Sequence, residues 1–290
     1  MHEFNYSIDE NFCGCQVQQF LKNKGFSRSI ITSLKHGNRL LCNGSHIRTI
    51  DLLETGDIIT VVLEDETDII PNPSLDIPIA YDDDDIVVFE KPPFMPVHPS
   101  LKHYDDTLAN YFTALYPQCV FRSINRLDRN TSGLVVVAKN KLAAARLSSD
   151  AKFRPQKVYY AIVGGDVTAR YGVSGEIIAP IARISESIIN REVRDDGQYA
   201  HTKFRVIKNK SRYSLLQIEL VTGRTHQIRV HFSWAGYPLI GDDLYGGDTT
   251  LLNRQALHCG EISLLHPVTE EKLTIKSPFP RDMQKIIDLI

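Results

Sequence analysis

A proline-rich stretch at residues 71–78 divides the chain and therefore limits what it can fold into. Three prolines stand there among asparagine, serine and aspartate, a composition typical of a linker between folding units. The 290 residues suffice for a domain of about 200 residues with a small appendage. We therefore predict a small domain over residues 1–70, a linker over 71–79 and a large domain over 80–290.

The apolar pattern of the large domain indicates more strands than helices. Ile86–Phe89 and Leu134–Ala138 are apolar runs of strand length, and residues 216–220 alternate with a period of two, as half-buried strands do. Residues 225–235 change to a helical period, and Trp234 is expected in the core. The predicted fold class is α+β, a mainly antiparallel mixed sheet with flanking helices.

The small domain is predicted to be a second α+β unit with separated charges. Two segments of helical spacing precede short strand-like pieces, and His36-Gly37-Asn38 is typical of a helix stop. Residues 11–50 contain six Lys or Arg and no Asp or Glu, whereas the acids lie in residues 51–68. The basic residues could bind RNA phosphates or form an ordinary solvated face. The candidate RNA contacts are Lys22, Lys24, Arg28, Lys35 and Arg39.

The totals exclude several classes of protein. A net charge of -2 gives no global basic field, so any RNA-binding surface must come from local charge. Five scattered cysteines argue against a disulfide framework and favour the cytoplasm. No signal-peptide pattern and no apolar run of roughly 20 residues is present. We expect a cytoplasmic monomer that does not enter a membrane.

Metal ligation is not expected. The spacing of Cys13-Gly14-Cys15 does not match the paired C-x₂₋₄-C pattern of zinc sites. His226 and His231 are five positions apart rather than the four of the H-E-x-x-H metalloprotease motif. The acidic run Asp82–Asp85 is interpreted as a solvated turn before a strand.

A polar loop before one predicted strand is the most informative segment. Residues 124–139 place Asp128 between Arg126 and Arg129 and then run into an apolar strand. Nearby positive charge favours the ionised form of a carboxylate. From these residues alone, a catalytic carboxylate and a structural Arg–Asp cluster that caps a strand both remain open.

This segment resembles the H-R-L-D-x-x-T-S-G signature of the RluA/RluD family of RNA pseudouridine synthases. Asn125 stands where the family usually has His, and Phe94 replaces a usual Gly in the K-P-x-G-x-x-V-H-P loop. Together the similar segments cover about residues 80–280. The other segments that resemble family motifs, in the same order along the chain, are residues 85–99, 157–161 and 222–242.

The resemblance implies a role for each matching residue. Asp128 is the expected catalytic carboxylate, and Arg229 is expected to pair with it. Tyr159 is expected to pack against the target uracil and is the candidate base; Tyr160, next to it on a strand, should face the other way. Arg126 would enter the RNA stack as the base leaves. For Arg224, a phosphate contact and a plain solvated role remain open.

The implied reaction fits a protein without a cofactor. Pseudouridine formation breaks a C–N glycosidic bond, turns the uracil and forms a C–C bond, so it is redox-neutral and transfers nothing to a second molecule. It needs an ionised nucleophile or base beside the ribose, exclusion of water and a base removed from the helix. We therefore expect no cofactor and no metal.

The small domain resembles the alpha-L RNA-binding module of small-subunit ribosomal protein four. The similarity lies in Ser27–Leu34, Leu40–Gly44 and Gly56–Ile59. It implies RNA as the partner, with large-subunit ribosomal RNA the preferred target and transfer RNA the alternative. Two other functions stay open: a non-catalytic RNA-binding or ribosome-assembly factor on the same fold, and a metal-dependent hydrolase.

Overall fold

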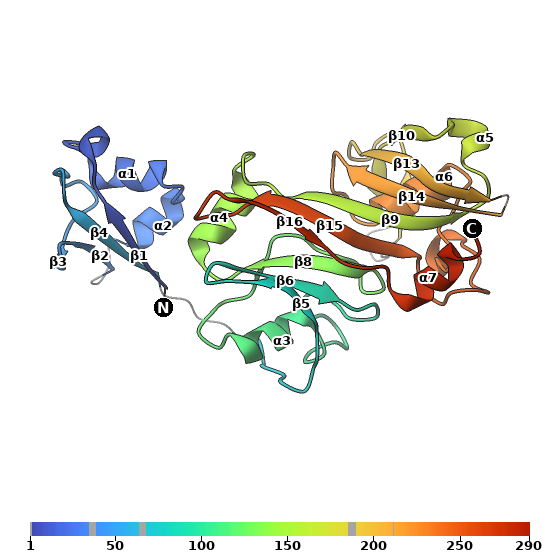
Figure 1. Ribbon diagram of the computed structural model, residues 1–290, viewed down its shortest axis with the longest axis horizontal. Coiled ribbons are helices and arrows are strands. Elements are labelled where there is room, and N and C mark those ends of the chain that lie inside the picture. Colours follow the sequence, from blue (N-terminus) through green and yellow to red (C-terminus); the bar gives the residue numbers. More distant parts are fainter. Residues whose placement is uncertain (1, 35–38, 64–67, 185–189, 211) are drawn as a thin grey trace.

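The part of the chain that the computed structural model describes comprises residues 2–34, 39–63, 68–184, 190–210 and 212–290. Figure 1 shows a small N-terminal body beside a larger body. Lys35 and the expected helix stop at residues 36–38 lie outside the described residues. Within the described residues, no helix combines the length and the apolar character needed to cross a membrane.

The small body is an antiparallel sheet with two short helices packed on it. Its strand order is β1-β4-β2-β3, and the N-terminal strand, which the sequence pattern did not reveal, pairs His2 with Leu63. Ser27 caps the second helix, because its hydroxyl oxygen accepts the N–H of Ile30 at 3.3 Å. The elements are β1 (His2–Ser7), η1 (Glu10–Phe12), α1 (Val17–Asn23), α2 (Arg28–Ser33), β2 (Leu40–Cys42), β3 (Ser45–His46) and β4 (Ile58–Leu63).

The larger body is built on one long mixed sheet of order β10-β13-β14-β9-β15-β8-β6-β5, with β16 on β15 and β7 on β8. Among the described strands of this sheet, β15 and β8 run parallel and the other neighbours are antiparallel. The strands are β5 (Ile79–Asp82), β6 (Ile86–Lys91), β7 (Arg122–Ser123), β8 (Ser132–Ala138), β9 (Gln156–Gly164), β10 (Ser174–Ile178), β13 (His201–Lys210), β14 (Tyr213–Leu220), β15 (Leu257–Leu265) and β16 (Lys272–Lys276).

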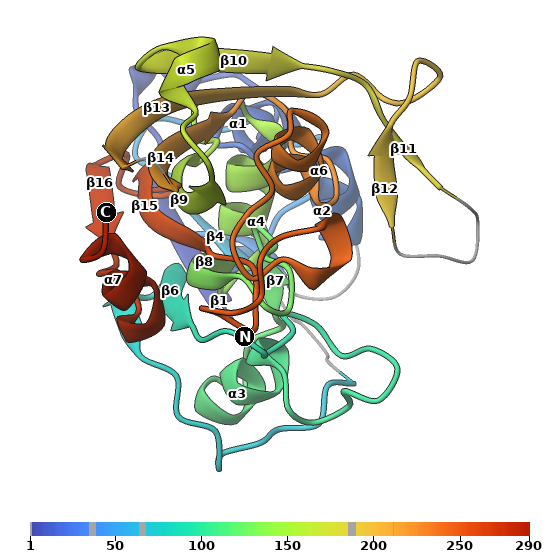
Figure 2. The ribbon, with the colours of Figure 1, turned by 90° about the vertical axis from the view of Figure 1, so that its right-hand side faces the viewer.

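Helices flank this sheet, and a short hairpin projects from it (Figure 2). The α+β class with a mainly antiparallel mixed sheet is therefore confirmed. The remaining elements are α3 (Leu108–Leu115), α4 (Lys141–Ser149), α5 (Thr168–Tyr171), the hairpin strands β11 (Ile181–Arg183) and β12 (Arg191–Val193), α6 (Gln227–Trp234), η2 (Asp243–Tyr245) and α7 (Arg281–Ile287).

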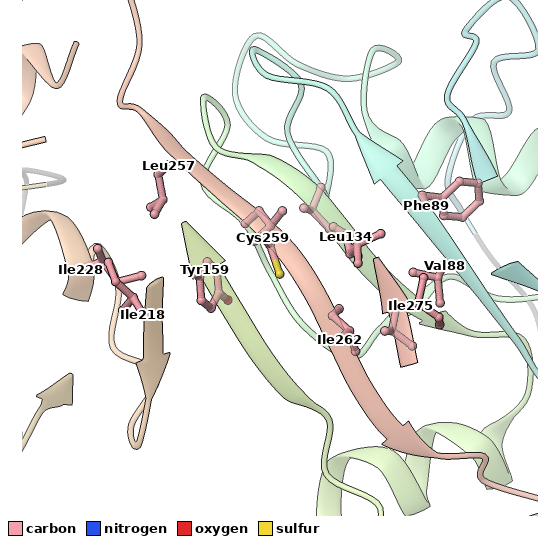
Figure 3. Close-up of a cluster of buried hydrophobic side chains, with 14 of the residues drawn as sticks. Val88, Phe89, Leu134, Tyr159, Ile218, Ile228, Leu257, Cys259, Ile262 and Ile275 are labelled. Atoms are coloured by element: carbon pink, nitrogen blue, oxygen red, sulfur yellow. The ribbon is translucent and has the colours of Figure 1, made fainter. Parts of the chain in front are cut away.

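Strand β9 shows how the sheet separates its two faces. Tyr159 is 6% exposed and lies in the main core beside Cys259 and Ile218 (Figure 3). Tyr160 belongs to a second cluster and packs edge-on against Phe279 at 5.0 Å between ring centroids. The predicted alternation of the two tyrosines is confirmed.

The expectation that Trp234 is a core residue was wrong. This side chain is 56% exposed at the end of α6. The buried positions of α6 end at Phe232, so the helix turns the Trp234 ring away from the sheet.

Helix α4 joins the two bodies. The apolar cluster of the small body includes Leu142 of α4, which is 1% exposed, and Ala145 packs against it. The Arg146 guanidinium donates to the carbonyl of Lys24 on one side and to that of Pro267 on the other. The small body thus contacts the larger one through both apolar packing and charge-assisted hydrogen bonds.

Candidate active site

A long open groove of about 1000 Å³ crosses the larger body. Its walls come from the loop before β8, the start of β9, and the segment between β14 and α6. The structure brings to this groove all the candidate residues that the sequence placed in the large domain: Arg126, Asp128, Tyr159, Arg224 and Arg229.

Asp128 lies in a turn that leads directly into β8. Its carbonyl accepts the N–H of Thr131 at 3.0 Å, and its side chain is 29% exposed to the groove. Asn125 is buried and uses its amide on the β8 backbone, donating to the carbonyl of Leu134 at 3.0 Å and accepting the N–H of Val136 at 2.9 Å. The residue that departs from the family signature therefore supports the strand and leaves the carboxylate alone.

Arg229, the ion-pair partner of Asp128, is itself held in place by a buried ion pair with Asp242. Arg229 donates from Nη1 to Asp128 Oδ2 at 3.1 Å, and from Nε and Nη2 to both oxygens of Asp242 at 2.7 and 2.8 Å. The side chain of Asp242 is 0% exposed. Two parallel bonds of this kind fix the plane of the guanidinium. Burial alone would lower the pKa of Arg229, but the two carboxylates raise it above its ordinary value.

The turn before α6 brings a further group to Asp128. His226 has a left-handed backbone with φ of 58°, and its Nε2 lies 3.7 Å from Asp128 Oδ2. Its Nδ1 lies 2.8 Å from the hydroxyl of Tyr245. Burial lowers the pKa of His226, so the ring is neutral at physiological pH. The sequence analysis did not predict the contact of His226 with Asp128, although His226 lies inside the 222–242 segment that resembles a family motif.

Tyr159 forms an apolar wall of the groove rather than an exposed base. Burial, the Cys259 thiol and the Asp128 carboxylate raise its pKa well above 10. The phenol is therefore protonated in the free protein. Its position in the groove beside Ile228 and Leu257 suits packing against a flat ring.

Lys91 is a buried basic residue that the sequence analysis did not select. It is 1% exposed, and its ammonium donates to the carbonyls of Pro92, Met95 and Arg129 at 2.8, 2.8 and 3.1 Å. Burial lowers its pKa to about 7, against the attraction of Asp128. Through the carbonyl of Arg129, this side chain holds the loop that carries Asp128.

The two arginines expected to touch RNA both remain accessible at the groove. Arg126 is exposed, and its guanidinium makes no hydrogen bond or ion pair with the described residues. Arg224 is also exposed, but its Nε donates to the carbonyl of Tyr199 at 3.0 Å. Arg126 is thus the freer of the two to move with a ligand.

The basic residues of the small body lie apart from the groove and differ in environment. Lys22 and Arg28 are exposed. The ammonium of Lys24 lies over the rings of Tyr6, Phe12 and Phe20 at 5.5 to 5.7 Å, so it is held by its own domain. Arg39 is half-buried.

Asp83, Asp85 and His266 form the group in the described chain whose geometry could hold a metal ion. His266 Nδ1 accepts the N–H groups of Val268 and Thr269 at 3.3 and 3.0 Å, so the ring proton must be on Nε2. That nitrogen lies 3.0 Å from Asp83 Oδ2. Nε2 is buried and its contact with Asp83 is not a hydrogen bond, but its proton would have to leave before a cation could bind there, and we interpret the cluster as structural. In the run Asp82–Asp85, Asp82 and Asp84 are exposed as predicted, whereas Asp83 and Asp85 are half-buried.

Known proteins resemble this chain along most of its length. Residues 85–234 match the family described as RNA pseudouridylate synthase. The chain is 37% identical to the "Uncharacterized RNA pseudouridine synthase YjbO" of Bacillus subtilis, over 93% of this chain and 98% of that protein. It is 35% identical to the "Ribosomal large subunit pseudouridine synthase D" of Pseudomonas aeruginosa, over 91% and 88% of the two chains.

A solved structure has the same fold. The human protein called "RNA Pseudouridylate Synthase Domain Containing 1" superposes with a TM-score of 0.58 at 26% identity. The match covers 70% of this chain and 83% of that one.

Proposed function

The chain belongs to the RNA pseudouridylate synthase family and is an isomerase that acts on RNA, and from that premise we propose that it converts uridines of large-subunit ribosomal RNA to pseudouridine with Asp128 as the catalytic carboxylate. One observation carries the assignment of Asp128. It is a partly exposed carboxylate in an open groove, held by an arginine that a second, fully buried carboxylate fixes in place.

The groove offers what the reaction needs. The carboxylate can act as nucleophile or base at the ribose or the uracil. Tyr159 supplies an apolar face for the uracil ring and removes water from one side of it. Arg126, exposed at the same groove, can fill the gap that a flipped base leaves in the RNA stack.

The RNA class is inferred from the relatives and from the small body. Relatives over most of the chain are named for the large ribosomal subunit. We propose that residues 1–70 form an alpha-L type RNA-binding domain, joined by residues 71–79 to a catalytic domain over 80–290. Exposed Lys22 and Arg28 would then contact RNA phosphates beyond the groove.

Asp128→Asn tests the catalytic assignment. The variant keeps the shape of the side chain but lacks the charge, so tritium release from RNA labelled at uracil C5 should fall to background. Circular dichroism checks that the variant is folded, and Lys22→Ala is the comparison for weakened RNA contact. Release near the wild-type rate from Asp128→Asn would remove Asp128 as the catalytic group.

Tyr159→Phe tests whether Tyr159 acts as a base or by packing. The raised pKa of the buried phenol argues for packing, so most of the turnover should remain. A complete loss of turnover in a folded Tyr159→Phe protein would instead assign the hydroxyl a chemical step.

A transcriptome-wide pseudouridine map with and without the protein tests the target. A site lost from large-subunit ribosomal RNA supports the proposal, and a site lost from transfer RNA replaces it with the alternative target. An unchanged map together with defective ribosomal subunits would support a non-catalytic factor. Against that alternative, Asn125, which departs from the family signature, hydrogen-bonds the β8 backbone rather than Asp128.

A further inference from the structure

We propose that His226 and Tyr245 are positioning residues for the Asp128 carboxylate. They hold Oδ2 in place and leave Oδ1 as the oxygen that contacts the nucleoside. This inference rests on the proposed role of Asp128 as the catalytic group. It assigns two residues and one atom that the family motifs alone do not distinguish.

The first step is the tautomer of His226. The hydroxyl oxygen of Tyr245 accepts the backbone N–H of Arg191 at 3.1 Å. Among the described residues, the remaining partner of that hydroxyl is His226 Nδ1 at 2.8 Å. The hydroxyl uses its single proton when it donates to Nδ1, and this tautomer places an N–H rather than a lone pair opposite the Asp128 carboxylate. The neutral ring then carries its proton on Nε2, the nitrogen that faces Asp128.

The second step is the inequality of the two Asp128 oxygens. Arg229 Nη1 lies 3.1 Å from Oδ2, and His226 Nε2 lies 3.7 Å from the same oxygen. Arg229 thus donates a hydrogen bond to Oδ2, and His226 Nε2 adds a longer electrostatic contact to the same oxygen, while Oδ1 has no hydrogen bond to a described residue. Since the side chain is 29% exposed and lines the groove, Oδ1 is the oxygen available to the ribose or uracil.

The third step is the backbone of His226. Few residues other than Gly adopt φ of 58°; His, like Asn and Asp, is found there more often than most, but the conformation is still strained. The strain persists at a site where the ring is only 9% exposed and points to the carboxylate. The histidine thus occupies a backbone position that glycine would adopt without strain.

Tyr245 connects both groups that hold Oδ2. Its ring lies over the Arg229 guanidinium at 4.9 Å, and its hydroxyl fixes His226. The charged groups that face the His226 ring are Asp128, Arg229, Arg191 and Asp242. Loss of the Tyr245 hydroxyl would therefore release the His226 ring without removing the cation–π contact of Arg229.

Nitrogen-15 NMR of histidine-labelled protein without RNA tests the tautomer. We expect His226 to show a protonated Nε2 and a bare Nδ1 near neutral pH, and His226→Asn assigns the signal by its loss. Tyr245→Phe should mix the two tautomers. A His226 protonated on Nδ1 in the wild type would overturn the proposal, whatever the enzyme does to RNA.

Single-turnover kinetics test the positioning role. His226→Gly and Tyr245→Phe should lower the rate of the chemical step on the order of 10-fold, with little change in RNA affinity. Urea unfolding of both variants checks that a lower rate does not come from loss of the fold. Wild-type rates in both variants would overturn the positioning role.

Two control variants separate positioning from general damage. Glu270→Gly relieves a comparable backbone strain, with φ of 62°, at a remote exposed turn. Tyr213→Phe removes a hydroxyl at the far end of β14. Both should keep the wild-type rate, and an equal loss of rate in the controls would count against the proposal. An inactive wild type with the expected tautomer would refute the proposed function alone.

Discussion

Asp242 shows how a residue without access to RNA can determine the chemistry of one that has it. Its fully buried carboxylate takes two of the nitrogens of Arg229 and leaves Nη1 for Asp128. The sequence placed Arg229 opposite Asp128 only through the family motif. The third member, Asp242, was within the 222–242 segment but had no assigned role.

Asp242→Asn should destabilise the protein by about 3 kcal/mol, because it leaves the Arg229 charge buried without its bidentate partner. Urea unfolding measures this loss. The exposed pair of Asp196 with Arg194 provides the comparison, and Asp196→Asn should cost less than about 1 kcal/mol. Equal effects in the two variants would show that burial is not what makes the Asp242 pair important.

His258 should make stability depend on pH in the acid range. The residue is 2% exposed, and burial lowers its pKa to about 4 from 6.5. Between these values the unfolded chain binds a proton that the folded chain does not, so stability is lost as pH falls from about 6.5 to about 4. At about 1.4 kcal/mol per pH unit the full loss is about 3 kcal/mol.

The measurement is the free energy of unfolding at several pH values for the wild type and for His258→Gln. The variant should show a flatter dependence below pH 6.5, whatever its absolute stability. His46→Gln, on the exposed strand β3, should retain the wild-type dependence. Parallel curves for wild type and His258→Gln would contradict the assignment.

For single residues, the sequence could predict which side chains meet at the site, but not how buried or strained they are. The motifs predicted that Asp128 and Arg229 would meet, and the contact is present at 3.1 Å. They could not reveal the strained backbone of His226 or the burial of Lys91, because both depend on packing between segments far apart in the chain. The catalytic role of Asp128 itself remains a prediction.

Among the secondary structure elements, the pairing of β8 with β15 is the hardest to predict from the sequence, and it leaves little room for a side chain. The apolar run of β8 was clear in the sequence, but nothing local shows that its parallel neighbour comes from residues 257–265. The two backbones approach so closely at Gly133 that a Cβ atom there would lie 2.3 Å from the carbonyl oxygen of Cys259.

Gly133→Ala should therefore cost more than about 3 kcal/mol, since its φ of 115° and the rigid Cys259 backbone leave no room for a methyl group. Thermal and urea unfolding measure the loss. Gly223→Ala, where an added Cβ meets nothing within 4 Å, should change stability by no more than about 0.5 kcal/mol. Normal stability of Gly133→Ala would mean that β8 and β15 are not so closely paired.

For the whole molecule, Arg146 is a side chain that hydrogen-bonds both bodies. Arg146 donates to carbonyls of both bodies, and its Nε would lie 2.4 Å from a Cβ added at Gly25. The prolines of residues 71–78 predict a linker, but the docking of the small body on α4 could not be predicted, because an apolar residue such as Leu142 does not show locally which element it will contact.

Arg146→Ala should loosen the small body and leave each body folded. Limited proteolysis should then cut the segment 68–78 faster than in the wild type, while the unfolding of the larger body changes little. Lys152→Ala, which removes an exposed ion pair with Glu270, is the control. Unchanged cleavage in Arg146→Ala would show that apolar packing on Leu142 suffices.

The position of β15 also determines when, during synthesis of the chain, the groove can first be completed. The strand lies between β9 and β8, yet it is made more than 90 residues after both. A nascent chain that stops before residue 257 has two partial sheets with open facing edges, which are prone to pair wrongly. The groove joins segments from both sides of this gap. The complete groove can therefore form only after residues 257–265 have left the ribosome.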